Sequence, residues 1–437
     1  KDMFQNAVQG ERKYKKIFVK LLTTPSGLVL VNSNPELVVE IAKFYWLRTD
    51  EEGRYGTGNY QAEIYGVSAD YDFKYWPASA YQTPIYWLLK RYEENTIEFV
   101  IESLNHAVIN YVQNMKKKEK YQVPQITIFI DGKTKKQYIN QDLWWIYRGM
   151  GNAPDLLVSM LAAVEKHLLE SGKDEDNDVL FRKLKDMILS SNSVAITAIG
   201  MSLIEAYPDK LFKLAYYFLE FPEFVILDRR RLSQEMGLGL MIGIGAIPNI
   251  PLSGEYVKER KEALEEKFRK NSFEITIMQY QIGTFFPIEF KKKLWELLDK
   301  KHKEYETVGD DDEIGMLYQR YYIQMDIRRQ EVNEYDKGEI HGVILEPKFD
   351  ERQSERLEEV KKNEELQNEK AELGLWVRAR FDERVSDYSK YTKYERNPEL
   401  SYQEMQNFDR FSSDNPHLAF LVQDLDLYIC CVLIRDF

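Results

Sequence analysis

The spacing of apolar residues is the feature that most constrains this fold. Along most of the 437 residues, apolar side chains recur at every third or fourth position, which is the period of an amphipathic helix. One such stripe starts after Pro84 with Ile85, Leu88 and Leu89 and continues as far as Val112. Proline is favoured in the first turn of a helix, so Pro84 and similar prolines mark expected helix starts. The pattern predicts a mainly α-helical fold.

The connections between these segments are short, and this predicts how the helices are arranged. Helices of roughly a dozen residues joined by tight, proline-marked turns favour antiparallel pairs stacked as an α-solenoid of the HEAT or TPR type. Residues 124–140 depart from the pattern, because Ile126, Ile128 and Ile130 occupy alternate positions before Asp131 and Gly132. Such alternation before an Asp-Gly pair indicates a β-hairpin. We therefore expect stacked helix pairs with one small β-hairpin insertion.

The composition changes near residue 250. Residues 1–250 are expected to hold the helical-repeat array, including the hairpin near 124–140. From 251 to 437 the helical segments are longer and carry more charge, which predicts a second, more charged helical region. Cys430 and Cys431 lie in an apolar stretch near the end, where two small buried side chains are a better interpretation than a redox pair.

Charge and hydropathy exclude several classes of protein. The formal net charge of −12 repels nucleic acid, so a nucleic-acid partner is not expected. The longest apolar run, residues 237–250, is short and contains Pro248, so it cannot cross a bilayer as a regular helix. Residues 1–15 are polar and charged, unlike a signal peptide. We expect a cytoplasmic protein with no membrane partner.

Motifs of enzymatic chemistry are either missing or better explained in another way. The sequence contains no GxxxxGK[ST] phosphate-binding loop, and its five histidines lack the spacing of zinc ligands. Glu289 and Lys291 have the Glu-x-Lys spacing of some nucleases, but they open a predicted helix instead of lying on a strand. The apolar run ending at Asp131 resembles a Walker B strand, although a hairpin tip explains it better. The acidic run at 310–313 is best explained as a loop that caps the next helix. We predict no catalytic residue, metal site or cofactor for this segment.

One enzymatic alternative stays open. Scattered carboxylates such as Glu165, Glu205 and Asp228 could assemble into a site if the fold buried them together in one pocket with perturbed pKa values. From the sequence alone these three residues are as easily charges on helix surfaces.

Two groups of residues are candidates for binding a protein partner. The first is part of an aromatic-rich region, since aromatic side chains on a concave surface are frequent hot spots; its candidates are Tyr71, Tyr75, Trp76 and Tyr81. The second is the basic run Arg229, Arg230 and Arg231. This run could contact phosphate, but in an acidic chain we favour pairing with acidic groups of the neighbouring helical repeat.

Several stretches resemble the helical C-terminal region of large bacterial STAND-type NTPases of the AVAST antiphage systems. They are WPASAYQTPIYWLL, LWWIYRGMGNAPDLLVSMLAAVEKHLL, SVAITAIGMSLIEAYP, FVILDRRR, LWVRARFDERVSDYSKYTKYERNPEL and the closing CCVLIRDF. The resemblance implies a cytoplasmic, ATP-dependent sensor whose effector and NTPase, with ATP and magnesium, lie upstream of Lys1. The catalytic residues of the family belong to its P-loop module, and none of them matches a position in this chain.

The expected function is therefore recognition without catalysis. In this interpretation the helical array binds a phage protein, communicates with the upstream NTPase and possesses no active site of its own, while the full-length protein could be an ATPase and a homo-oligomer. The alternative is a generic helical-repeat adaptor in another multiprotein assembly.

Overall fold

The computed structural model divides the chain into two compact units, Lys1–Pro347 (unit 1) and Lys348–Phe437 (unit 2). The residues that it describes are 12–23, 27–47, 60–68, 78–238, 253–282, 286–309, 312–337, 340–355, 357–358, 373, 376–377, 380, 392–414 and 425–436.

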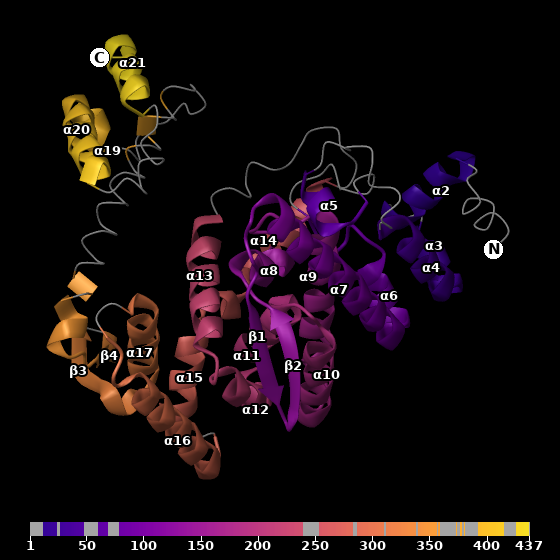
Figure 1. Ribbon diagram of the computed structural model, residues 1–437, viewed down its shortest axis with the longest axis horizontal. Coiled ribbons are helices and arrows are strands. Elements are labelled where there is room, and N and C mark those ends of the chain that lie inside the picture. Colours follow the sequence, from indigo (N-terminus) through magenta and orange to yellow (C-terminus); the bar gives the residue numbers. More distant parts are fainter. Residues whose placement is uncertain are drawn as a thin grey trace. The chain divides into compact units, whose positions relative to one another are not determined.

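Unit 1 is built mainly of α-helices (Figure 1). Those before the first hairpin are α2 (Arg12–Thr23), α3 (Gly27–Ser33), α4 (Pro35–Trp46), α5 (Tyr60–Tyr65), α6 (Ile85–Arg91) and α7 (Glu93–Lys118). The helices that follow it are α8 (Gln141–Trp145), η2 (Ile146–Arg148), α9 (Asp155–Ser171), α10 (Asn177–Ser190), α11 (Val194–Ala206), α12 (Pro208–Phe218), α13 (Pro222–Leu238), α14 (Ser253–Glu265), η4 (Lys267–Lys270), α15 (Phe273–Ile282), α16 (Ile288–Tyr305), α17 (Glu313–Met325) and η5 (Ile327–Arg329).

Polar side chains start several of these helices. The carboxamide of Asn34 accepts a hydrogen bond from the Leu37 amide before α4, and Ser193 does the same for the Ala195 amide before α11. The predicted cap after the acidic run is also present, because Asp312 accepts from the Gly315 amide at the start of α17. These bonds satisfy amide groups that have no partner within a helix.

Helix α11 lies at the centre of unit 1. Its residues from Val194 to Glu205 are all buried, and it contacts α8, α9, α10, α12 and α15. A helix that is apolar on every side must be surrounded by other elements. The prediction of a mainly α-helical fold with a small β-hairpin insertion is confirmed. Helix α11 is the element that its neighbours share. No described helix is both long and apolar enough to cross a membrane.

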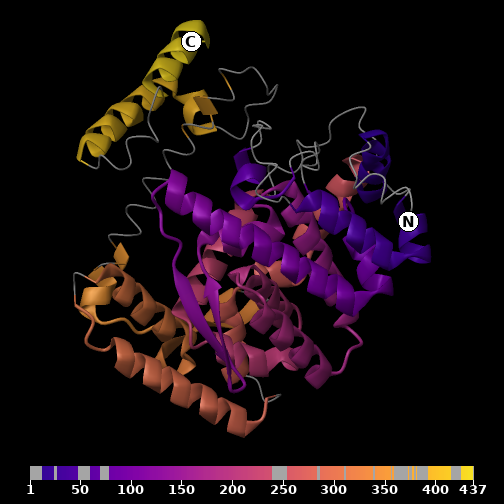
Figure 2. The same cartoon turned by 45° about the vertical axis from the view of Figure 1, so that its right-hand side comes forward.

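The predicted hairpin is formed by β1 (Gln125–Ile130) and β2 (Lys133–Tyr138), which pair in antiparallel register. Asp131 and Gly132 both have positive φ, as a two-residue hairpin turn requires. Ile128 and Ile130 are buried, and the strands pack on α10 and α12; Figure 2 shows the hairpin and the long α7 from a second side. The Gln137 amide donates to the Ile188 carbonyl at 2.8 Å and accepts from the Thr197 hydroxyl at 2.7 Å.

A second hairpin, which the sequence pattern did not indicate, is formed by β3 (Gln330–Lys337) and β4 (Ile340–Pro347). Val332, Val343 and Ile344 are exposed on it. In the sequence of its strands the apolar residues do not alternate regularly with polar ones, so the pattern that reveals a half-buried strand is missing.

The boundary between the units also differs from the expected one at residue 250. Helices α15, α16 and α17 contribute Ile277, Leu294 and Tyr322 to the same hydrophobic core as α4 and α11. The higher surface charge after residue 250 therefore marks helices at the edge of this core and no separate unit.

Unit 2 contains α19 (Thr392–Arg396), α20 (Pro398–Asp414) and α21 (Leu425–Asp436). Its described core consists of Leu373, Trp376, Val377, Tyr394, Met405, Ile429 and Val432. On α21 the buried positions are Ile429 and Val432, whereas Cys430 is half-buried and Cys431 is exposed. The expectation of two buried cysteines is therefore wrong for Cys431, because adjacent residues of a helix point in different directions.

Candidate functional site

A cluster of charged side chains is buried where η2, α9, α11, α13 and η4 meet. Each of its members is less than a tenth exposed, and they are Arg148, Glu165, Glu205, Asp228, Arg231, Glu235 and Arg269. Charged groups are rarely buried unless they are paired, so their contacts decide what this cluster does.

Arg231 is the centre of one half of this cluster. Its Nε donates to Asp228 at 2.7 Å and its Nη1 to Glu235 at 2.8 Å. Its Nη2 lies 3.0 and 3.1 Å from the two oxygens of Glu205. The guanidinium also donates to the backbone carbonyls of Arg269 and Asn271. Arg231 therefore joins α11, α13 and the segment around η4.

Glu165 and Arg148 form the other half. Glu165 accepts from Arg269 Nη2 at 2.8 Å and from the Ser202 hydroxyl at 2.5 Å, and it lies 3.5 Å from Arg148 Nη1. The Nε of Arg148 pairs with Glu235. Glu235 thus contacts both Arg148 and Arg231 and connects the two halves into one network.

The environment shifts the carboxyl pKa values in opposite directions. Burial raises the pKa of Glu165, but the guanidiniums of Arg269 and Arg148 outweigh it and hold this pKa below its usual value. Burial is likewise outweighed at Glu235 by Arg148 and Arg231, which lower its pKa to about 2. Burial raises the pKa of Glu205 well above normal despite Arg231.

The three carboxylates of the enzymatic alternative are thus brought together. However, Glu165, Glu205 and Asp228 are each held in an ion pair by an arginine. A general acid or base must exchange its proton with a substrate in contact with it. The geometry therefore favours a network that fixes the helices over a catalytic site.

The basic run at 229–231 divides into residues with different surroundings. Arg229 donates to Glu274 of α15 at 3.1 Å and lies over the Tyr321 ring, while Arg230 is exposed and donates to the Gln141 carboxamide. Arg231 is 1% exposed, which removes it from any surface contact and corrects its inclusion among the partner-binding candidates. The expected pairing with acidic groups of a neighbouring helix is found for Arg229, with Glu274 of α15, and for Arg231, with Glu205 of α11.

The aromatic candidates are only partly within the described residues. Tyr71, Tyr75 and Trp76 lie outside them. Tyr81 is half-buried and packs against the half-buried rings of Tyr86 and Trp87, with centroids 5.2 and 5.7 Å away. Of the predicted binding residues, Tyr81, Arg229 and Arg230 thus keep at least part of their side chain at the surface.

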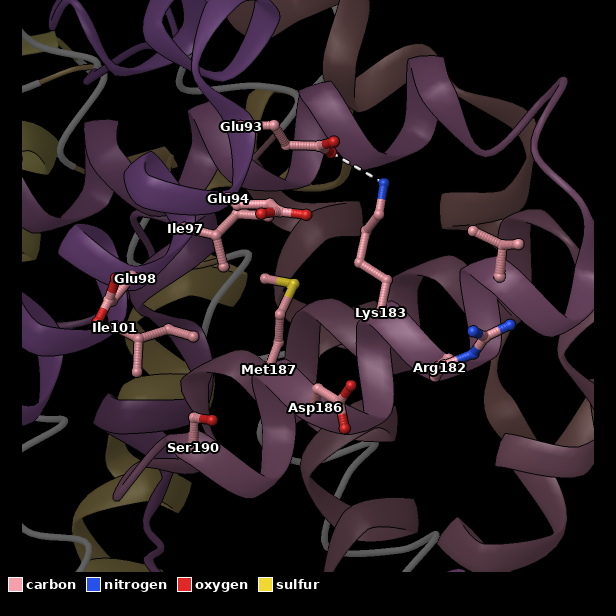
Figure 3. Close-up of a pocket in the computed structure, with 11 residues that line it drawn as sticks. Glu93, Glu94, Ile97, Glu98, Ile101, Arg182, Lys183, Asp186, Met187 and Ser190 are labelled. Carbon is pink, nitrogen blue, oxygen red and sulfur yellow. Dashed lines mark hydrogen bonds and ion pairs between the residues drawn. The ribbon is translucent and has the colours of Figure 1, made fainter. Parts of the chain in front are cut away.

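Two surface grooves lie on either side of α10. The first, between α7 and α10, has a volume of about 630 Å³ and is drawn in Figure 3. Ile97 and Ile101 of α7 lie on one side of it and Met187 of α10 on the other. Its charged margin consists of Glu93, Glu94, Glu98, Arg182, Lys183 and Asp186. Glu93 pairs with Lys183 at 2.9 Å and with His167 of α9 at 2.8 Å.

The second groove lies between α10, α12, α16 and the tip of the first hairpin, and it has a volume of about 640 Å³. Its aromatic lining consists of Phe181, Phe212, Tyr216, Tyr217 and Phe290. Phe129 of β1 is 50% exposed and packs edge-on against Tyr217 with centroids 6.4 Å apart. The cations of this groove are Arg182, Lys185, Lys213 and Lys293, so Arg182 borders both grooves.

Sequence reasoning missed both grooves. The residues that line them belong to apolar helix faces that also pack on the core. The helical period predicts such a face, but it does not show which part of the face remains exposed to solvent. The signal that could have pointed to the second groove is Tyr216–Tyr217, because adjacent residues of a helix point in different directions and both of these rings are only half-buried.

No group of His, Cys, Asp and Glu side chains among the described residues is arranged to hold a metal ion. Comparison of the chain with known protein families finds no matching family model, and comparison with curated proteins finds no match.

Proposed function

We propose that this chain is a non-catalytic recognition and scaffold region that binds a protein partner through α10 and its two grooves. The residues that line these grooves are called the α10 face. The observation that carries the proposal is that two open grooves of similar size flank one helix and share Arg182 at their common edge.

The composition of the α10 face supports a protein partner. Tyrosine, phenylalanine and arginine are enriched in the centres of protein interfaces, and the second groove is lined by such residues. The first groove has apolar side chains between acidic and basic margins, which suits an amphipathic helix laid along it. The buried ion-pair network supports the scaffold part of the proposal, because it connects five helices by directional bonds.

The biological setting that we propose follows from the resemblance to STAND-type NTPases. In this setting the partner is a phage protein, and its binding biases an NTPase, with ATP and magnesium, in the upstream part of a cytoplasmic defence protein. The competing proposal is an adaptor that assembles other proteins without an NTPase.

The test is co-purification of the full-length protein from phage-infected cells, followed by mass spectrometry. Wild type is compared with Arg182→Ala, since Arg182 is exposed and borders both grooves, and with the matched control Arg396→Ala, an exposed arginine that lines neither groove. We expect one phage protein to be retained stoichiometrically by wild type and by the control. Loss of a central interface arginine weakens binding by about tenfold or more, so Arg182→Ala should retain much less.

The outcomes separate the parts of the proposal. A phage protein retained equally by Arg182→Ala would show that the α10 face is not the binding surface. Retention of host proteins alone, in infected and uninfected cells, would favour the adaptor.

A further inference from the structure

The charges of the first groove of the α10 face do not cancel. Glu93 and Lys183 form an ion pair of 2.9 Å and so neutralise each other. The other charged side chains of its margin are Glu94, Glu98, Asp186 and Arg182. Within the described part of the chain, none of these four forms an ion pair. Three carboxylates therefore remain against one cation, and the unpaired charge of this groove is negative.

The three carboxylates come from both helices that form the groove (Figure 3). Glu94 and Glu98 are one helical turn apart on α7, and Asp186 belongs to α10. All three are exposed. In the apolar lining, Ile97 is half-buried and Val179 is 41% exposed, so part of this lining is open to solvent. The groove thus combines an uncovered apolar surface with exposed carboxylates on both margins.

The dimensions of the groove suit a short helix. One bridge between α7 and α10 is the ion pair of Glu93 with Lys183. Another is the hydrogen bond of 3.1 Å from the Asn105 carboxamide to the Ser190 carbonyl, and the two bridges fix the spacing of the helices. The residues of α10 that line the groove run from Val179 to Ser190, which at about 1.5 Å per residue is about 17 Å of helix. A partner helix of about three turns covers this length.

We propose that the first groove binds an amphipathic helix with lysine or arginine on both sides of its apolar stripe. Apolar side chains one turn apart on this helix contact Ile97 and Val179, and its cations pair with the carboxylates of both margins. A helix with acidic flanks would place like charges against each other, which lowers its affinity. The inference rests on the proposed function, because it names the kind of helix that the α10 face accepts.

The test is a fluorescence-anisotropy titration of three labelled synthetic peptides with the full chain. Each peptide has the length of α10, which is 14 residues. The first has leucines at helical spacing and lysines at the flanking positions, and the second has glutamates in place of the lysines. The third keeps the lysines but has alanines in place of the leucines. A salt concentration of about 0.15 M screens charges more than about 8 Å apart, which limits attraction by the net charge of −12.

Two double variants of the chain test whether the margin of the groove is responsible. Glu94→Gln combined with Glu98→Gln removes two carboxylates of the groove. The matched control is Glu36→Gln combined with Glu40→Gln, which makes the same change at exposed positions of the same spacing on α4, outside both grooves. Circular dichroism checks that both variants are folded.

We expect the peptide with lysines and leucines to bind wild type at least about tenfold more tightly than either of the other two peptides. Removing the Glu94 and Glu98 carboxylates should weaken this binding about fivefold, and the control should leave it unchanged. Equal or tighter binding of the glutamate peptide would overturn the proposal. Equal binding of the alanine peptide, or equal weakening in the two double variants, would also overturn it, because attraction by charge alone would then be sufficient.

Co-purification with the whole partner separates this inference from the proposed function. Loss of the partner from Arg182→Ala, but not from the double variant at Glu94 and Glu98, would keep the α10 face as the binding surface and refute the basic helix. Loss from both would support both. Retention by Arg182→Ala equal to that of wild type would refute the α10 face itself.

Discussion

Replacing Arg231 with methionine should destabilise unit 1 severely. The change keeps a long apolar side chain but removes every hydrogen bond from the guanidinium to Asp228, Glu205 and Glu235. Breaking a buried ion pair typically costs about 3–5 kcal/mol, because the remaining charge stays buried without a partner. Three carboxylates lose a partner here, although Glu235 keeps Arg148, so we expect a loss at the upper end of that range, about 5 kcal/mol.

Arg229→Met is the matched control, since it makes the same chemical change two residues earlier on α13. The Arg229 side chain is 47% exposed, so solvent screens its ion pair with the 12% exposed Glu274, and we expect this pair to be worth about 1 kcal/mol. Urea denaturation followed by circular dichroism gives the free energy of unfolding of both variants. A loss below about 1 kcal/mol for Arg231→Met, or equal losses for the two variants, would refute the reasoning that this network holds unit 1 together.

Three further predictions follow from particular contacts. Gln137→Leu should cost about 1–2 kcal/mol in urea denaturation, because the buried Thr197 hydroxyl loses its partner while the Ile188 carbonyl keeps only the bond from the Ser191 amide; a neutral effect would contradict this. Gly132→Ala should cost about 1 kcal/mol, since its φ of +79° is unfavourable for a Cβ although no atom lies near one; a larger loss would show a steric contact. Hydrogen bonds from His167 and, to a smaller extent, Lys183 lower the pKa of Glu93 to about 2, below its unfolded value near 4.5. Ionised Glu93 therefore stabilises the fold above about pH 5, and this contribution is lost as the pH falls towards 2. The stability of Glu93→Gln should therefore fall less steeply over this pH range than that of wild type, and identical slopes would be inconsistent with the ion pair.

The elements that could be predicted are those fixed by nearby residues. The first hairpin is an example, because the turn at Asp131–Gly132 and the alternation before it are both local. The helices are another example, since an apolar stripe and a capping side chain such as Asp312 lie within one or two turns of each other. Local signals of this kind determine which elements form.

The candidate sites depend on residues far apart in the sequence, and this explains why they were harder to predict. The sequence suggests only that three carboxylates, those of Glu165, Glu205 and Asp228, could assemble into one site. Nothing in the sequence pairs them with particular arginines. Arg229 and Arg231 are the same residue type in the same basic run, yet Arg229 lies at the surface and Arg231 is buried. The difference arises because each residue of α13 is rotated by about 100° from the one before it. The residues around this run are also charged, so the sequence does not show which side of the helix faces the core.

A short series of contacts leads from the α10 face to α9, the helix that also carries Glu165 of the buried network. Lys183 of α10 pairs with Glu93 of α7, and Glu93 also pairs with His167 of α9. His167 lies two residues after Glu165, which belongs to the buried network. A partner helix in the first groove would compete for Lys183 and Glu93 and would therefore act directly on α9. A recognition region needs a continuous series of contacts of this kind in order to transmit binding to the rest of a protein. If these contacts transmit binding, the partner should change hydrogen exchange in α9 of wild type, and this change should disappear in Glu93→Gln.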